Sequence, residues 1–218
     1  MSAGQAAATL SVGESVAVLD NTSSQNPSAS RISLLGRVPG NGAIWVGIFA
    51  EMTEFAFMFL IYFIAKVHYL ELFDQGPQQL NTTAGTLNTL ALLTSSYCVA
   101  KAMVAVRRSD NKVAARWLWG TIGCALFYLA VKAWEYQWNT EQGFAADTNL
   151  FFTVYYYMTF NHFLHVAWGG CAVLWVIFRL KRGAYSAEDH EGMEAVACYW
   201  HMIDLVWIII FPLLYVLR

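Results

Sequence analysis

The sequence predicts an all-α, polytopic membrane protein, built as a bundle of five transmembrane helices. The first observation is composition: 57% of the 218 residues are hydrophobic, 16% are aromatic and only 13% are charged, whereas about a quarter of the residues of a globular domain are charged. The second is the distribution of the charges, which gather in clusters and leave long apolar stretches between them. The net charge of −2 and the lack of a glycine-rich phosphate loop argue against nucleic-acid binding and nucleotide chemistry.

Five apolar stretches are each long enough to form a membrane-spanning helix. They cover approximately residues 44–69, 84–106, 114–136, 149–180 and 194–217. A helix needs roughly 20 apolar residues to cross about 30 Å of hydrocarbon, and every stretch exceeds that length. We therefore expect one helix from each stretch, in this order.

The basic residues between the stretches predict the orientation, because Lys and Arg favour the cytoplasmic side. Basic residues precede the first stretch, separate the second from the third and follow the fourth: Arg31, Arg37, Arg107, Arg108, Lys112, Arg116, Arg179, Lys181 and Arg182. The connections at 70–83 and 137–148 contain acidic residues and neither Lys nor Arg. The N-terminus is therefore expected inside and the C-terminus outside.

Two regions follow from this organisation. Residues 1–43 are expected to form a cytoplasmic N-terminal tail, because the first 30 or so are rich in Ser, Ala, Asn and Gln and lack the features of a signal peptide. This tail is expected either to be disordered or to order on a partner. Residues 44–218 form the membrane domain.

Cysteines and aromatic residues are expected to have mainly structural roles. The four cysteines lie within the predicted spans without metal-like spacing, so we expect small buried hydrophobic side chains at Cys98, Cys124, Cys171 and Cys198. Part of the aromatic content is expected to form belts at the membrane interfaces, for example at Trp45, Trp138 and Tyr215.

Polar residues within the spans are the candidate functional residues, because an ionisable group in a membrane costs a few kcal/mol and usually faces the bundle interior or a partner. Four pairs have a spacing of three residues, which places both members on one helical face. These pairs are Glu51 and Glu54, Lys132 and Glu135, His162 and His165, and His201 and Asp204, with Asn161 next to the third pair.

Depth in the membrane suggests that two of these pairs belong together. Glu51 and Glu54 lie seven and ten residues after Ile44, and His201 and Asp204 lie seven and ten residues after Glu194. Both spans enter from the cytoplasmic side, so all four side chains are expected roughly 10 to 15 Å into the membrane. We predict one polar cluster in the inner leaflet, with one carboxyl group able to exchange protons with the cytoplasm.

Three kinds of chemistry suit these residues. A metal site is one, because Glu-x-x-Glu, His-x-x-His and His-x-x-Asp each place two ligands on one helical face. A b-type haem held by two histidines chosen from His162, His165 and His201 is the second. The third is structural, with polar side chains that hydrogen-bond between helices, and the residues alone favour it.

Several stretches together resemble subunit III of the haem-copper oxidases, that is, cytochrome c oxidase subunit III. "IWVGIFAEMTEFAFMF" is similar to the family's first conserved helix, and "LNTLALLTSSYCVAKA" to its Leu-Asn-Thr and Ser-Ser segment. "WEY" at 134–136 is similar to its Glu-Tyr pair, and "NHFLHV" stands where the family has His-Gly-Leu-His-Val. "YWHMIDLVWIIIFPLLYVLR" resembles its C-terminal segment, and the ending looks most like the five-helix, NorE-like branch.

The resemblance covers residues 44–218 and implies a non-catalytic subunit with no metal site of its own. It implies a catalytic partner with haem and copper or iron, either an oxidase or a nitric oxide reductase, and leaves open which of the two. It also implies bound phospholipid, support of proton uptake and turnover stability, and a place in the bacterial inner (cytoplasmic) membrane. Among the candidates it marks Glu51, His201 and Asp204, has no clear counterpart for Glu54, and makes His162 and His165 structural.

Overall fold

The computed structural model describes residues 39–40, 42–186 and 189–217, so most of the tail predicted over residues 1–43 lies outside the described residues. The described residues contain helices and connections but no strand. Five helices are long and apolar enough to cross a membrane, which confirms the predicted all-α, five-span architecture. They are α3 (Gly42–His68), α5 (Thr82–Arg107), α6 (Asn111–Glu141), α7 (Leu150–Lys181) and α8 (Glu191–Phe211).

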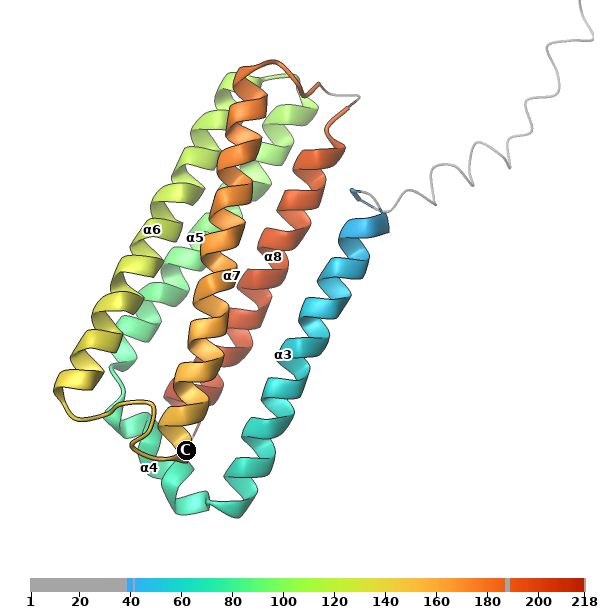
Figure 1. Cartoon of the computed structure of the whole chain (residues 1–218). Coiled ribbons are helices and arrows are strands. Elements are labelled where there is room, and N and C mark those ends of the chain that lie inside the picture. The colour runs from blue at the N-terminus through green and yellow to red at the C-terminus, as the bar shows by residue number, and fades with distance from the viewer. Residues whose placement is uncertain (1–38, 41, 187–188, 218) are drawn as a thin grey trace, which may run out of the picture. The chain divides into compact units, whose positions relative to one another are not determined.

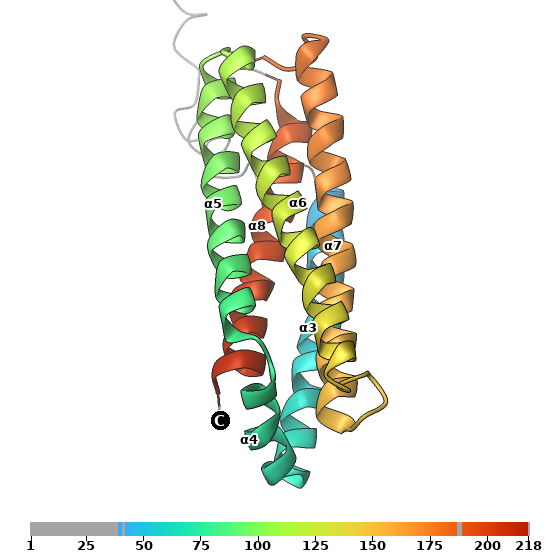
Figure 2. The same cartoon turned by 90° about the vertical axis from the view of Figure 1, so that its left-hand side faces the viewer.

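Successive long helices run in opposite directions (Figures 1 and 2). Helices α5, α6, α7 and α8 pack into a four-helix arrangement, and α3 lies beside α7 and α8 at its edge. Only 22% of the most apolar stretch of α3 is buried, against 50% for the last span. Helix α3 therefore exposes the most apolar surface of the five to lipid or to a partner.

The described parts of the two basic connections, residues 107–116 and 179–186, lie together at one end of the bundle, which we call the basic end (Figure 2). The acidic connections lie at the opposite end, as an antiparallel five-helix order requires. Three of the long helices have an N-cap residue whose side-chain oxygen accepts a backbone N–H of the first turn: Asn81 for α5, Asp110 for α6 and Asn149 for α7. Each cap satisfies a backbone donor that the helix itself leaves unpaired.

The connection after α3 contains a short helix, α4 (Leu70–Gln79), where the sequence predicted only a connection. Its buried face packs on the start of α7, with the Phe73 and Phe151 rings 5.5 Å apart. At Gly76 an added Cβ would lie 2.4 Å from the Phe151 ring. Glycine therefore allows the close packing that holds this short helix in place.

The last span ends in a π-helical turn, η1 (Pro212–Val216). Pro212 has no backbone N–H, so it cannot continue the regular α-helical hydrogen bonding. The hydroxyl of Tyr62 on α3 donates to the carbonyl oxygen of Leu213 at 2.7 Å, in a buried setting. This bond ties the peripheral helix α3 to the end of the chain.

Candidate functional site

The polar pair on α3 contacts α7. The Glu51 carboxylate lies 2.6 Å from Nε2 of His165, and Nδ1 of the same ring lies 2.8 Å from the carbonyl oxygen of Asn161. One turn further along α3, Glu54 accepts a hydrogen bond of 2.6 Å from the Asn161 side-chain amide. Two carboxyl groups of α3 are thus bound to one turn of α7.

The geometry of His165 determines where protons can lie. A carbonyl oxygen only accepts, so Nδ1 of His165 carries a hydrogen and donates it to Asn161. The short contact between Nε2 and Glu51 then requires one more proton, either on the carboxyl group or on the imidazole. Glu51 and His165 therefore form a proton-sharing pair at the edge of the bundle, where the Glu51 side chain is 33% exposed.

His201 and Asp204 on α8 face α5 instead. Nδ1 of His201 pairs with the Ser96 hydroxyl at 2.7 Å, and the indole of Trp200 donates to the Ser95 hydroxyl at 2.9 Å. Asp204 is buried, and its carboxyl oxygens make no direct hydrogen bond within the described residues, although Ser96 is near enough to interact with them. The serine pair of α5 therefore faces the polar residues of α8.

These contacts differ from the pairing expected from depth. Helices α3 and α8 do lie side by side, but in the described part of the chain no hydrogen bond joins Glu51 or Glu54 to His201 or Asp204. The hydrogen bonds link α3 to α7 and α5 to α8. A shared role of the four side chains as one cluster stays a prediction.

His162 packs deep in the bundle through its ring. The centroid of its ring lies 6.3 Å from the ring centroid of Phe55, 5.7 Å from that of Tyr128 and 5.1 Å from that of Trp207. These three aromatic side chains come from three other helices. Neither ring nitrogen has a hydrogen-bond partner among the described residues, and the same holds for the buried Tyr128 hydroxyl and Asn88 side chain. His162 thus joins helices by ring packing, not by the hydrogen bonds that the sequence suggested.

A fully buried polar network surrounds Lys132. Its ammonium group contacts Glu135 at 3.1 Å, the Tyr155 hydroxyl at 3.1 Å and the Tyr215 hydroxyl at 2.6 Å. Both hydroxyls donate to the other oxygen of Glu135, at 3.0 and 2.6 Å, and Asn139 donates to Tyr155 at 3.3 Å. All three ammonium protons have acceptors, and three helical segments, α6, α7 and η1, meet in this network.

Sequence reasoning identified Lys132 and Glu135 but missed the tyrosines that complete the network. Tyr215 was expected at the membrane interface; that prediction is wrong, because this side chain is buried at 4% exposure and bound to both charges. A usable signal was the face shared by Lys132, Glu135 and Asn139, at intervals of three and four residues. A buried ion pair on such a face needs further hydrogen-bond partners from its neighbours.

The cysteines are also less uniform than expected. All four are free, but only Cys98 is buried. Cys124 and Cys198 are half-buried and Cys171 is exposed, so the expectation of four buried thiols is wrong. Apolar side chains in a membrane protein can face lipid at no cost, and hydropathy alone does not separate a buried cysteine from a lipid-facing one.

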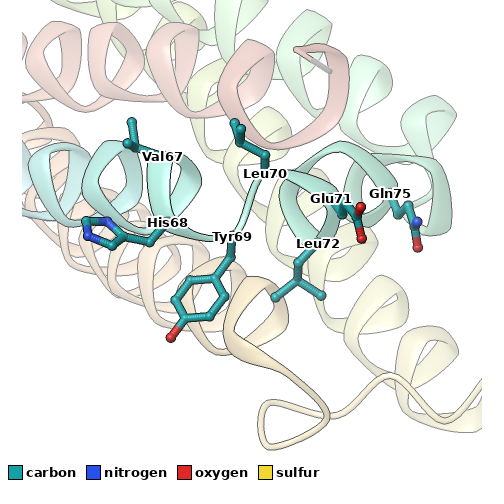
Figure 3. A pocket seen from close by; sticks show the side chains of 7 residues that line it. All are labelled: Val67, His68, Tyr69, Leu70, Glu71, Leu72 and Gln75. Atoms are coloured by element: carbon teal, nitrogen blue, oxygen red, sulfur yellow. The ribbon is translucent and has the colours of Figure 1, made fainter.

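A surface hollow of about 600 Å³ lies where α3 turns into α4 (Figure 3). Its polar side chains do not converge, because Glu71 and Gln75 lie along α4 and apart from His68 on α3. Across residues 42–186 and 189–217, no three His, Cys, Asp or Glu side chains are grouped so as to hold a metal ion. Of the histidines of the alternative haem or metal site, His162 and His165 both pack against the Phe55 ring, whereas His201 pairs with Ser96 on α5.

The fold and these contacts define a class: a multi-pass membrane protein whose polar side chains join its own helices. The family model of cytochrome c oxidase subunit III matches residues 41–217. The chain therefore belongs to the cytochrome c oxidase subunit III family, the family of a non-catalytic subunit of haem-copper oxidases.

Individual relatives agree with this assignment. The chain is 32% identical over 173 residues to cytochrome c oxidase subunit 3 of Thermostichus vulcanus, which covers 79% of this chain and 84% of the relative. It is 34% identical over 169 residues to cytochrome c oxidase subunit 3 of Synechocystis sp., and this match covers 77% of this chain and 71% of the relative. It is also 28% identical over 179 residues to the haem-copper oxidase subunit I+III of Aeropyrum pernix, covering 79% of this chain and 22% of that protein. These names are those of oxidases, and the NorE-like branch stays a prediction.

Proposed function

We propose that this chain is the accessory subunit of an oxygen-reducing haem-copper oxidase and docks on its catalytic subunit I. The observation that carries the proposal is the relative from Aeropyrum pernix, whose name joins subunits I and III and whose matching part is 22% of its length. One polypeptide containing both regions keeps them together in one membrane. In this proposal the haem and copper belong to the partner, and this chain supplies helices, lipid contacts and a proton-sharing pair.

The fold supports a docking role through α3, whose apolar side chains are the least covered of the five spans. Exposed side chains continue along the helix, for example Phe49, Phe57, Ile61 and Ile64. Lipid and a larger membrane subunit are the two apolar surroundings available to them. We propose that membrane lipids, including bound phospholipid, cover what subunit I leaves exposed.

Co-purification tests the proposal. The tagged chain, expressed together with its oxidase genes and extracted in a gentle detergent, should bring down subunit I with its haem absorption and oxygen-reducing activity. Recovery of no oxidase subunit from cells that express one contradicts the docking role. Recovery of a nitric-oxide-reducing partner instead would support the branch suggested by the ending "FPLLYVLR".

The isolated chain provides the second arm. We expect a colourless protein without iron. A stoichiometric Soret band or bound iron would instead favour a free-standing membrane metalloenzyme or b-type cytochrome that uses His162, His165 and His201.

We further propose that Glu51 exchanges protons with the surface on behalf of the catalytic partner. The pairing of Glu51 with His165 at 2.6 Å supports this role, because a hydrogen shared by a carboxylate and an imidazole at this distance can be carried by either group. Glu51→Gln keeps the shape and hydrogen-bonding capacity, so the oxidase should assemble but change its turnover against pH. Glu51→Leu removes the tie to α7 as well and should assemble poorly.

Glu54→Gln is the matched control, because Glu54 lies one turn away on the same helix and binds an amide, not an imidazole. It should leave the pH profile unchanged. The proton role is wrong if the Gln and Leu variants of Glu51 both assemble and turn over like the parent at every pH tested.

The basic end is proposed to face the cytoplasm of a bacterial inner membrane. The basic connections that gather there support this orientation. Single cysteines introduced at Lys112 and at Glu141, in a background without the native cysteines, should react from opposite sides of sealed membranes. Labelling of both from the same side would contradict the five-span topology, and reversed sides would contradict the orientation.

A further inference from the structure

Three polar side chains in the interior of the bundle make no direct hydrogen bond. They are Asn88 on α5, Tyr128 on α6 and His162 on α7, and all three are fully buried. Both amide atoms of Asn88, the Tyr128 hydroxyl and both ring nitrogens of His162 have no hydrogen-bond partner in the described part of the chain. Burial of such groups costs free energy unless a new hydrogen-bond partner replaces the water that they gave up on folding.

The packing of α5 against α6 places two of these side chains at one depth. The Thr121 hydroxyl of α6 donates to the carbonyl oxygen of Ser95 on α5 at 3.4 Å, which sets the register of the two antiparallel helices. Asn88 lies seven residues before Ser95, and Tyr128 lies seven residues after Thr121. Seven residues are close to two helical turns, so Asn88 and Tyr128 lie on the same facing surfaces at a shared level.

The Trp207 ring of α8 connects the third side chain to this level. Its centroid lies 5.2 Å from that of Tyr128 and 5.1 Å from that of His162, and the last two lie 5.7 Å from each other. The indole N–H of Trp207 donates to the hydroxyl of Thr89, the neighbour of Asn88, at 2.9 Å. Four helices therefore contribute to one layer, in which the indole N–H is already paired and the other polar groups are not.

The chemistry of this layer favours a neutral ligand that both donates and accepts hydrogen bonds. An amide, a phenol and an imidazole together offer donors and acceptors. The Lys132 ammonium group lies 5.6 Å from the centre of the Trp207 ring, so a metal cation would meet repulsion here. That ammonium group is paired with Glu135 at 3.1 Å, so its charge is not free to attract an anion. Water meets these conditions.

We propose that ordered water binds between Asn88, Tyr128 and His162 and joins α5, α6 and α7 through bridging hydrogen bonds. Buried water typically makes about three hydrogen bonds, which is one to each of these side chains. A second molecule can pair with the remaining amide and imidazole atoms. His162 then connects helices through water as well as through ring packing, which explains a histidine where a phenylalanine would also pack. The site does not depend on the oxidase partner.

Radiolytic hydroxyl labelling of the full chain in lipid nanodiscs, read by mass spectrometry, tests the site. The radical forms from water itself, so a buried side chain is labelled only when a water molecule lies beside it. Tyr62 is the matched control, because it is another fully buried tyrosine whose hydroxyl donates directly to the Leu213 carbonyl oxygen at 2.7 Å. In water labelled with heavy oxygen, Tyr128 should take up the label faster than Tyr62. Equal rates would overturn the proposal.

Substitution of Asn88 tests whether the label depends on this layer. Asn88→Leu removes a bridging side chain and keeps a similar size, so labelling of Tyr128 should fall to the level of Tyr62. Ser95→Ala is the control, because it removes a buried hydroxyl from the same helix two turns away. It should leave labelling of Tyr128 unchanged. Equal effects of the two variants would contradict a site at Asn88, and the labelling of the parent decides the matter if Asn88→Leu does not fold.

Unfolding of Tyr128→Phe gives a second readout with a distinct sign. Removal of a hydroxyl that water bridges should raise the equilibrium constant of unfolding about fivefold, whereas removal of an unpaired buried hydroxyl should lower it. A lowered or unchanged constant would overturn the proposal. A raised constant without labelling of Tyr128 would indicate a direct bond to a neighbouring side chain, and would overturn it too. Every arm uses the isolated chain, so failure here leaves the oxidase partnership standing.

Discussion

Removing one charge of the Lys132 network is expected to destabilise the bundle more than any other single polar substitution in it. In Glu135→Gln the amide oxygen can still accept from Tyr155 and Tyr215, but its NH₂ group then faces the Lys132 ammonium, donor against donor. The lysine stays buried with its charge unpaired. Breaking a buried ion pair from one side costs about 3–5 kcal/mol, whereas an inter-helix hydrogen bond in a membrane averages only about 0.6 kcal/mol.

Lys132→Met leaves the opposite charge behind. Glu135 keeps two hydroxyl donors but loses its cation, so a loss of about 3–5 kcal/mol is expected here as well. The double variant Lys132→Met with Glu135→Gln has no buried charge, and both tyrosines keep an acceptor. Its loss should therefore be smaller than the sum of the single losses by about 2 kcal/mol.

Reversible unfolding of the purified chain in mixed detergent micelles, followed by circular dichroism, gives these free energies. Glu141→Gln is the control, because it removes a carboxylate from the same helix at an exposed position. It should change stability by less than about 0.5 kcal/mol. The reasoning is refuted if either single variant of the network matches this control, or if the double variant loses the full sum.

Three further outcomes are expected. Gly76→Ala forces a methyl group against an aromatic ring of α7 and should lower the free energy of unfolding by about 1–3 kcal/mol. Gly123→Ala adds a methyl group in open space and should raise the free energy of unfolding by up to about 1 kcal/mol. Unfolding measurements compare the two variants. A membrane-permeant thiol reagent should label the exposed Cys171 well before the buried Cys98, and equal rates would contradict the packing. Burial raises the pKa of Tyr185. The contribution of the neutral side chain to the stability of the fold is therefore complete below about pH 10 and is lost as the pH rises through the higher pKa of the folded state. An absorbance titration compared with Tyr185→Phe should show tyrosinate at this position only above its usual pH range.

Much of the fold could be predicted because span length and charge clusters are local properties of the chain. The predicted spans correspond to the five long helices, with ends differing by a few residues; α6, for instance, covers 111–141 where 114–136 was expected. The extra turns begin at a cap, Asp110, and continue past the apolar stretch through polar residues that a hydropathy reading discards. The short helix α4 was missed for a different reason. Its position depends on contact with Phe151, which is distant in the sequence.

The partners of the polar residues could be predicted only in part, because depth along a helix can be counted but rotation about its axis cannot. Glu51 lies nine residues after the first residue of α3 and His201 ten residues after the first residue of α8, so their depths are similar. The rotation of α3 turns Glu51 toward α7, and the rotation of α8 turns His201 toward α5. Similar depth is therefore compatible with hydrogen bonds to different helices, α7 for Glu51 and α5 for His201.

The polar contacts between helices explain why particular polar residues are needed to orient the helices of this bundle. In a membrane, an apolar side chain gains little free energy from contact with a neighbouring helix instead of with a lipid chain. Hydrophobicity therefore determines how deep a helix lies in the membrane but not how it is rotated about its axis. Each polar contact orients one helix about its axis relative to a neighbour. Glu51 orients α3 toward α7, Ser96 orients α5 toward α8, and Lys132 orients α6 toward α7 and the end of the chain. Of these, the ties through Glu51 and through Ser96 lie at partly exposed positions, whereas the Lys132 and Glu135 side chains are fully buried. The same kind of contact thus joins helices both in the buried core and at the edge of the bundle, where it holds Glu51, the residue for which we propose a proton role.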